Sequence, residues 1–254
     1  MIGAERIIKL VLEYDGGAYA GWQRQKGIVT IQEVIETALR TMLHEPVTLH
    51  GSGRTDAGVH ATGQVAHFVT AATYEAGVFQ NALNALLPPD IAVKEASEAP
   101  SGFHARYSVQ SKRYHYLICN RFVRPALMRD RAWHVRVPLD LEAMAGALES
   151  IEGTHDFSAF QSAGSCAKSP VRTIFQQSLS EDANGMVCVA LKADGFLRHM
   201  VRNTVGTLVQ VGGHAITPSD FTRVLTGKDR SRAGPKAPPQ GLYLVEVEYG
   251  QHSD

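Results

Sequence analysis

The order of its strand and helix signals is the feature that most constrains this chain of 254 residues. In the first part, short runs rich in Ile, Leu and Val alternate with apolar patterns at helical spacing. We expect strands over 7–14, 47–50, 64–70 and 91–95 and helices over 31–42 and 74–87. Thr30 and Glu33 match a capping box at the start of the first helix. This β-α-β-β-α-β order is that of the split βαβ, or ferredoxin-like, unit.

The second part of the chain repeats this order in topology but not in sequence. We expect strands over 111–120, 171–180, 186–193 and 242–249 and helices over 141–151, 197–211 and 218–225. Asp140 and Thr217 stand where N-caps are favoured, and Asn184-Gly185 is a hairpin turn signal. The pattern predicts an α+β fold of two ferredoxin-like domains, 1–104 and 105–254, whose antiparallel sheets lie side by side around a central cleft.

Composition places the chain among ordinary globular proteins. Hydrophobic residues make up 44% of it and charged residues 20%, and no apolar run reaches the roughly 18 residues of a membrane span. Residues 1–10 lack the apolar centre of a signal peptide. Cys119, Cys166 and Cys188 are odd in number and form no C-x-x-C pair. This cysteine usage indicates a reducing cytoplasm and argues against a zinc site.

Charge is balanced over the whole chain but not along it. The net charge is +0, yet residues 102–137 contain one carboxylate, Asp130, among eight cations. The cations are Arg106, Lys112, Arg113, Arg121, Arg124, Arg129, Arg131 and Arg136. Such a cluster suits the phosphate backbone of a nucleic acid, and it is equally compatible with an ordinary solvated surface.

The most unusual segment is the glycine-punctuated loop over 51–60, in which Arg54 and Asp56 stand two residues apart. Glycine permits left-handed backbone and the close approach of a ligand, so the two charges would be displayed at a strand end. A carboxylate there could act as a nucleophile or a general base. The alternative is a turn in which Asp56 bonds its own backbone and pairs with Arg54.

Further blocks of sequence carry a more specific signal than this loop alone. The central block is Gly53-Arg54-Thr55-Asp56-Ala57-Gly58-Val59-His60, followed by Gly63-Gln64-Val65. The others are Tyr14-Asp15-Gly16, Gly21-Trp22-Gln23-Arg24-Gln25, residues 84–90, Phe103-His104-Ala105-Arg106, Lys112-Arg113-Tyr114, residues 153–160, residues 196–203 and Gly241-Leu242-Tyr243-Leu244. Taken in their order along the sequence, these blocks cover nearly the whole chain and resemble the bacterial tRNA pseudouridine synthase A family.

The resemblance implies a homodimer of chains that each contain two ferredoxin-like domains, with tRNA as the macromolecular partner. It implies an isomerase that flips uridines 38, 39 and 40 out of the anticodon stem-loop and converts them to pseudouridine. Nothing is oxidised and no group leaves in this rearrangement, so we expect no cofactor. We also expect no metal, because the histidines are not spaced as ligands.

The resemblance also implies roles for individual residues. Asp56 matches the catalytic aspartate, Arg54 the basic residue that helps to displace the target nucleotide, and Tyr114 the tyrosine that stacks on the uracil. Arg202 matches the basic partner of the aspartate, and Leu242 the apolar residue beneath the site. Further residues expected to bind RNA are Arg24, Arg106, Lys112, Arg113 and Arg198. The spacing of Arg198 and Arg202 predicts that they share a helix face.

Two other activities compete with this interpretation. A glycoside or nucleoside hydrolase also attacks an anomeric carbon, but most such enzymes use two carboxylates, and the signature loop offers one. A non-catalytic RNA-binding protein of this fold would be expected to lack Asp56. The sequence leaves open whether Asp56 attacks C1′, attacks C6 of the base or removes a proton from the sugar.

Overall fold

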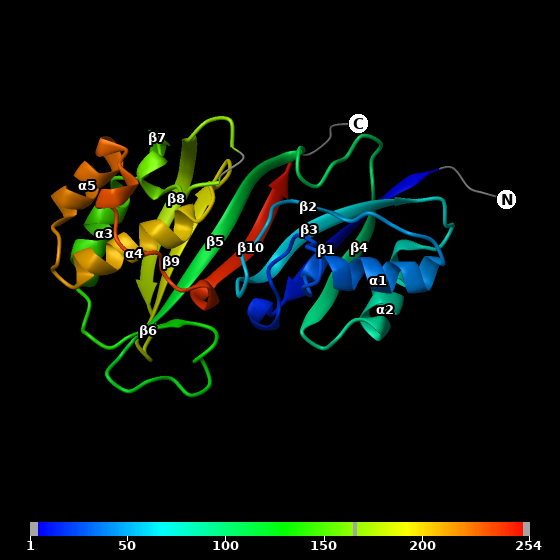
Figure 1. Ribbon diagram of the computed structural model, residues 1–254, viewed down its shortest axis with the longest axis horizontal. Coiled ribbons are helices and arrows are strands. Elements are labelled where there is room, and N and C mark those ends of the chain that lie inside the picture. The colour runs from blue at the N-terminus through cyan, green and yellow to red at the C-terminus, as the bar shows by residue number, and fades with distance from the viewer. Residues whose placement is uncertain (1–4, 165–166, 251–254) are drawn as a thin grey trace. The chain divides into compact units, whose positions relative to one another are not determined.

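The computed structural model describes residues 5–164 and 167–250, so Cys166 and the first four residues lie outside the described part. Over these residues the chain is a mixed α and β protein (Figure 1). It divides into two compact units, Met1–Gln110 with Leu244–Asp254 and Ser111–Tyr243, each over its described residues. The domains 1–104 and 105–254 stay a prediction, because a compact unit reflects packing and a domain reflects independent folding. No described helix is long and apolar enough to cross a bilayer.

The first unit contains a sheet in the order β4-β1-β3-β10, with β2 pairing to β3 and β1 antiparallel to both neighbours. Alternate residues Ile8, Leu10 and Leu12 are fully buried, because successive side chains of a strand face opposite sides of the sheet. Phe68 of β3 meets Phe79 of α2 with ring centroids 5.4 Å apart. The elements are β1 (Arg6–Tyr14), α1 (Ile31–Leu43), β2 (His50–Gly51), β3 (His60–Thr70), α2 (Ala76–Leu86), β4 (Ile91–Ala99) and β10 (Leu242–Tyr249).

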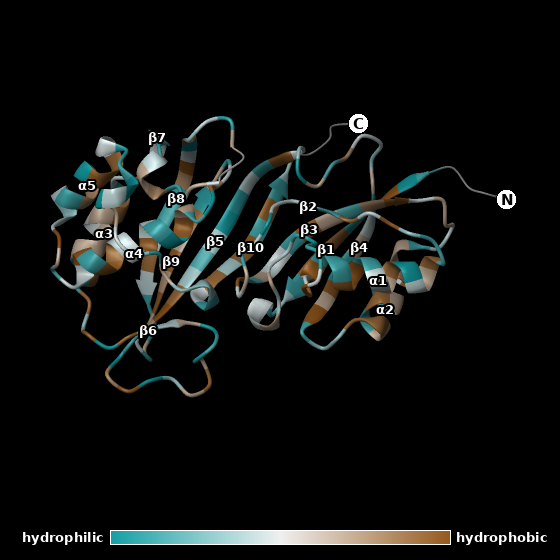
Figure 2. Ribbon diagram, in the orientation of Figure 1, coloured by the Kyte–Doolittle hydropathy of each residue, from teal (hydrophilic) through white to brown (hydrophobic). Residues whose placement is uncertain are grey.

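Helix α1 begins where its apolar pattern predicted but without the predicted cap. Ile31, Ile35 and Leu39 are fully buried and form its inner face, and hydrophobic segments of α1 are visible in Figure 2. Thr30 is the N-cap residue, yet its buried hydroxyl has no hydrogen-bond partner among the described residues. The capping box of Thr30 and Glu33 is therefore wrong, since burial of this apolar face outweighs a cap of about 1 kcal/mol.

The second unit has a sheet in the order β5-β9-β8-β7, with β6 parallel to β5. Its elements are β5 (Val109–Asn120), β6 (Trp133–Val135), α3 (Leu141–Glu149), β7 (Gly153–Asp156), β8 (Val171–Glu181), β9 (Met186–Ala193), α4 (Met200–Gly212) and α5 (Pro218–Gly227). The predicted N-cap at Asp140 is confirmed by its bond from the Ala143 amide, and Thr217 forms a capping box with Asp220. The rings of Phe160 and Phe221 stack 5.5 Å apart and join α5 to the core.

Several elements differ from expectation. The strand predicted over 47–50 is reduced to the two residues His50–Gly51. Strands β6 and β7 were missed because segments of 3 and 4 residues are too short to show an alternating pattern. The helix predicted from residue 197 begins at Met200, since His199 has a left-handed φ of 62° that interrupts helical backbone.

Helix α4 supplies a stability prediction. A Cβ at Gly206 would lie 1.8 Å from the Pro235 carbonyl oxygen, whereas one at exposed Gly146 of α3 would meet nothing within 4 Å. We expect Gly206→Ala to lower the free energy of unfolding by about 1–3 kcal/mol, the usual cost of overpacking. The matched Gly146→Ala should raise it by up to about 1 kcal/mol, because alanine favours helix. Urea unfolding measures both changes, and the same sign for both would contradict the assigned packing.

Candidate active site

The loop that carries Arg54 and Asp56 joins β2 to β3 and is fixed by backbone hydrogen bonds. The Trp22 amide donates to the Thr55 carbonyl at 3.0 Å, and the Val59 amide donates to the Asp56 carbonyl at 3.1 Å. Gly58 closes this turn with a φ of +77°, which glycine adopts without strain. The backbone on both sides of the Asp56 side chain is thus held in one shape.

A buried polar network lies beneath the loop. The Ser52 hydroxyl donates to Gln64 Oε1 at 2.6 Å, and Gln64 Nε2 donates to the Gly53 carbonyl at 2.9 Å. The Tyr14 and Thr55 hydroxyls are 2.8 Å apart, and both side chains are buried. Burial raises the pKa of Tyr14 to about 12, so its hydroxyl stays protonated and bonded. These contacts satisfy polar groups that water does not reach.

The Trp22 ring packs against the same loop at Gly51. Its side chain is 2% exposed, and a Cβ at Gly51 would lie 2.5 Å from its ring. Gly21, with a φ of +92°, lets the chain pass close to the loop, since a Cβ there would lie 2.6 Å from the Thr55 carbonyl oxygen. The two glycines therefore permit a packing distance that larger residues would prevent.

The two charged side chains of the loop differ in exposure. Asp56 is half-buried, whereas Arg54 is exposed. Arg54 Nε donates to Gln23 Oε1 at 3.1 Å, so a residue from the Gly21–Gln25 block holds the guanidinium. Gln23 was not among the predicted site residues, although it stands beside Arg24 in that block.

Tyr114, Arg202 and Leu242 belong to the second unit, and each is at most 7% exposed. The Tyr114 ring meets Phe196 edge-on, with centroids 5.0 Å apart. Arg202 Nε donates to the Ala237 carbonyl at 2.8 Å, and the Ala237 amide donates to the Arg202 carbonyl at 3.1 Å. The backbone and the side chain of Arg202 are thus tied to the same residue.

The segment that precedes β10 makes further hydrogen bonds to α4, at residues near Arg202. Arg230 Nη2 donates to Asn203 Oδ1 at 3.0 Å, and the Gly234 amide donates to the Thr207 hydroxyl at 2.9 Å. At its far end the Tyr116 hydroxyl donates to the Pro238 carbonyl at 2.7 Å. Burial raises the pKa of Tyr116, and the charge of Arg202 lowers it, which places the two side chains within electrostatic reach of each other.

Several of the side chains expected to bind RNA make contacts within the protein. Arg24 pairs with Glu36 at 2.9 Å, Arg113 donates to Gln176 at 3.2 Å, and Arg106 lies 5.7 Å from the centre of the Tyr107 ring. Lys112 is half-buried on β5.

The position of Arg198 differs from the prediction that it lies on a helix. It precedes α4, which begins at Met200, and its Nη1 donates to the Ala163 carbonyl at 2.9 Å. The prediction that Arg198 and Arg202 share a helix face is therefore wrong, because the left-handed His199 separates them.

Three histidines gather in the first unit, where His50, His67 and His104 have ring centroids 4.7–5.3 Å apart. The Ala105 amide donates to His67 Nδ1 at 3.1 Å. Burial, together with the neighbouring His104 and His50, lowers the pKa of His67 to about 4. In the described part of the chain, no group of three or more His, Cys, Asp or Glu side chains is arranged to hold a metal ion.

Comparison with known proteins places these residues in a family. A family model described as tRNA pseudouridine synthase matches residues 10–108 and 147–250. A tRNA pseudouridine synthase A from Acetivibrio thermocellus is 48% identical over 96% of this chain and 100% of its own length. The proteins of the same name from Geotalea uraniireducens and Geobacter sulfurreducens are each 47% identical, with the same coverage.

The network beneath the loop generates a second prediction. Tyr14→Phe removes the hydroxyl that meets Thr55 and Gln64, and the buried Thr55 hydroxyl loses its hydrogen-bond partner. We expect it to lower the free energy of unfolding by about 1–3 kcal/mol. The matched Tyr107→Phe alters a side chain that is 76% exposed and should change it by less than about 0.5 kcal/mol. Equal effects in urea unfolding would contradict the network.

Proposed function

Because the chain belongs to the tRNA pseudouridine synthase family, we propose that it converts uridine to pseudouridine in tRNA. The observation that carries the proposal is the Arg54–Asp56 loop, which lies inside a family match spanning most of the chain. We place the target uridines at positions 38, 39 and 40 of the anticodon stem-loop.

The reaction defines what the site must do. The N1–C1′ bond of the target uridine breaks, the uracil turns, and C5 bonds to C1′. C5 loses its proton and N1 gains one, so substrate and product are isomers and no redox partner is required. Asp56 is the catalytic carboxylate of this rearrangement, and the rigid loop around it supports the role, because a fixed group needs little reorganisation in the transition state.

Four further residues have roles in the proposed site. Arg54 holds the strand from which the uridine is flipped, at a cost of a few kcal/mol. The Tyr114 ring stacks on the uracil, which contributes about 1–3 kcal/mol. Arg202 is the basic partner of Asp56, and Leu242 packs beneath the base. The internal bonds that fix Arg202 support its role, since a held guanidinium keeps its charge in one place.

The proposal extends to fold and assembly. Each chain comprises two ferredoxin-like domains, and two chains form a homodimer that binds tRNA. The strand order β4-β1-β3, with β2 also pairing to β3, supports a ferredoxin-like first domain. Arg106, Lys112, Arg113 and Arg198 supply further contacts to RNA phosphates.

Replacement of Asp56 tests this function. Asp56→Asn keeps the shape and the turn-forming capacity of the side chain but removes its charge and its basic oxygen. We expect turnover on tRNA to fall below about 1% of the parent value, since one positioned acid–base group contributes about 10²–10⁴. Binding of tRNA should persist, as a filter-binding assay would measure, because a carboxylate does not attract phosphate.

Asp182→Asn is the matched control. Asp182 accepts hydrogen bonds from the Asn184 and Met186 amides in the β8–β9 turn, which is the kind of turn role that the alternative interpretation assigns to Asp56. Its replacement should change turnover by less than about twofold, because asparagine serves equally in such turns. Near-normal pseudouridine formation by folded Asp56→Asn protein would refute the assignment.

A further inference from the structure

Arg24 and Arg54 are both connected to two buried polar residues of α1. Gln32 and Glu36 are 6% and 7% exposed and stand one helical turn apart. Arg24 Nη1 lies 2.9 Å from Glu36 Oε2, and Arg54 is reached from Gln32 through Gln23. Two exposed cations therefore depend on a polar network inside the first unit.

The amide of Gln32 is fully used. Its Oε1 accepts from Gln23 Nε2 at 2.7 Å and from the Arg24 amide at 2.9 Å. Its Nε2 donates to Glu36 Oε1 and to the Leu49 carbonyl, each at 3.0 Å. Four contacts meet the two donors and the two acceptor sites that a glutamine side chain has.

These contacts determine which way the amide groups of Gln32 and Gln23 are oriented. Glu36 and the Leu49 carbonyl offer only acceptors to Gln32, so the Gln32 amide must turn its NH₂ group toward them. Its oxygen then faces Gln23, which must present its own NH₂ group in return. The oxygen of Gln23 is left to accept from Arg54 Nε. The charge of Glu36 thereby fixes the orientation of each side chain as far as Arg54.

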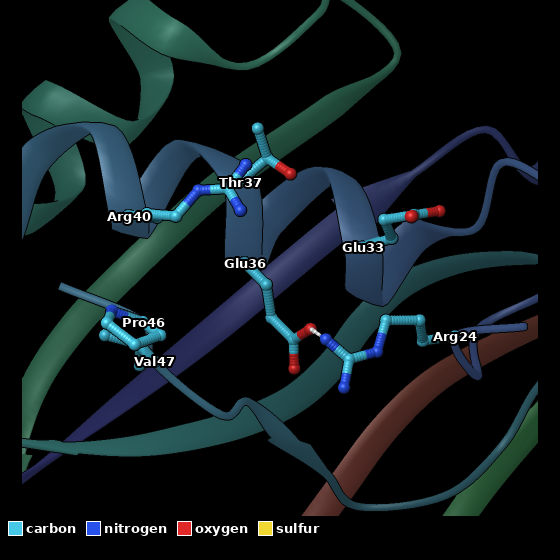
Figure 3. A pocket seen from close by; sticks show the side chains of 7 residues that line it. All are labelled: Arg24, Glu33, Glu36, Thr37, Arg40, Pro46 and Val47. Atoms are coloured by element: carbon cyan, nitrogen blue, oxygen red, sulfur yellow. Dashed lines mark hydrogen bonds and ion pairs between the residues drawn. The ribbon is translucent and has the colours of Figure 1, made fainter. Parts of the chain in front are cut away.

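Glu36 also holds Arg24 directly. Figure 3 shows its carboxylate facing the Arg24 guanidinium in a small pocket between α1 and the segment that contains Pro46 and Val47. The carboxylate accepts from Arg24, from Gln32 and from the Leu49 amide at 3.0 Å. A buried carboxylate requires such donors, because an unpaired buried charge is strongly unfavourable.

We propose that Gln32 and Glu36 are positioning residues that orient Arg54 and Arg24 toward the phosphates of the bound RNA, an inference that rests on the proposed function. Arg54 is held through Nε, which leaves the outer edge of its guanidinium, with both Nη nitrogens, directed away from Gln23. That edge can meet a phosphate with two parallel hydrogen bonds. A fixed guanidinium loses less entropy on binding than a mobile one.

A double-mutant cycle tests the proposal in the full-length protein. Gln32→Met keeps the length of the side chain and removes all four hydrogen bonds. We expect it to lower kcat/KM on tRNA by about 10- to 100-fold, since a misplacement of about 1 Å can cost 10²-fold. In an Arg24→Ala/Arg54→Ala background, the same change should cost less than about twofold, because the groups it positions are absent.

Gln23→Met is a second variant that tests the same proposal if the Gln32→Met protein folds poorly. It interrupts the path to Arg54 and leaves the Glu36–Arg24 pair in place, so its cost should disappear in an Arg54→Ala background. Gln80→Met is the matched control, because it removes a solvent-exposed hydrogen bond from α2 to the Lys94 carbonyl, and it should leave kcat/KM within about twofold of the parent.

Equal costs with and without the arginines would overturn the proposal, because a merely structural role does not depend on them. That outcome is distinct from failure of the proposed function, in which the parent protein itself forms no pseudouridine.

Discussion

The shape of the loop over 51–60 depends on the hydrogen bonds of one buried amide, that of Gln64. The side chain is fully buried on β3, so its donors and acceptor must find partners within the protein. It finds them in the Ser52 hydroxyl, the Gly53 carbonyl and the Tyr14 hydroxyl. The loop over 51–60 can satisfy this amide in only a narrow range of shapes, and that range displays Arg54 and Asp56 at its surface.

The second unit reaches rigidity by a different route, the close approach of backbone. Gly206 admits the Pro235 carbonyl against α4, and Gly241 admits the chain against the Tyr116 ring. The segment between Pro235 and Gly241 contains Ala237, whose carbonyl accepts a hydrogen bond from Arg202. The small residues therefore bring the chain close enough for one backbone group to fix a buried guanidinium. The loop over 51–60 and the side chain of Arg202 are each held by internal hydrogen bonds, and groups fixed in this way lose less entropy when a ligand binds.

The structure shows which elements the sequence pattern predicts and which it does not. The long strands β1, β3, β5 and β9 were predicted because each carries a run of strand-forming residues long enough to be recognised in the sequence. The Arg54–Asp56 loop was predicted from its glycines and its family signature. The short strands β6 and β7 were not, since a few residues carry no period.

The positioning residues had no comparable signal. Gln32 and Glu36 occupy helical positions where polar residues are ordinary, and only their burial distinguishes them. Arg230 stands in a loop rich in Pro, Gly and charge, and its bond to Asn203 joins residues that are far apart in the chain. A spacing rule cannot predict such pairings, because they depend on which loop lies on which helix.

The most direct test of the account is to follow the target base itself. Unmodified tRNA labelled with tritium at C5 of its uridines would be incubated with the protein in the presence of EDTA, with magnesium-independent folding of the RNA verified. The account predicts release of tritium in step with pseudouridine at positions 38, 39 and 40, and no free uracil, because the base changes its bond without leaving. Free uracil would indicate a hydrolase, and unchanged tRNA would indicate a binding protein; either result would contradict the account.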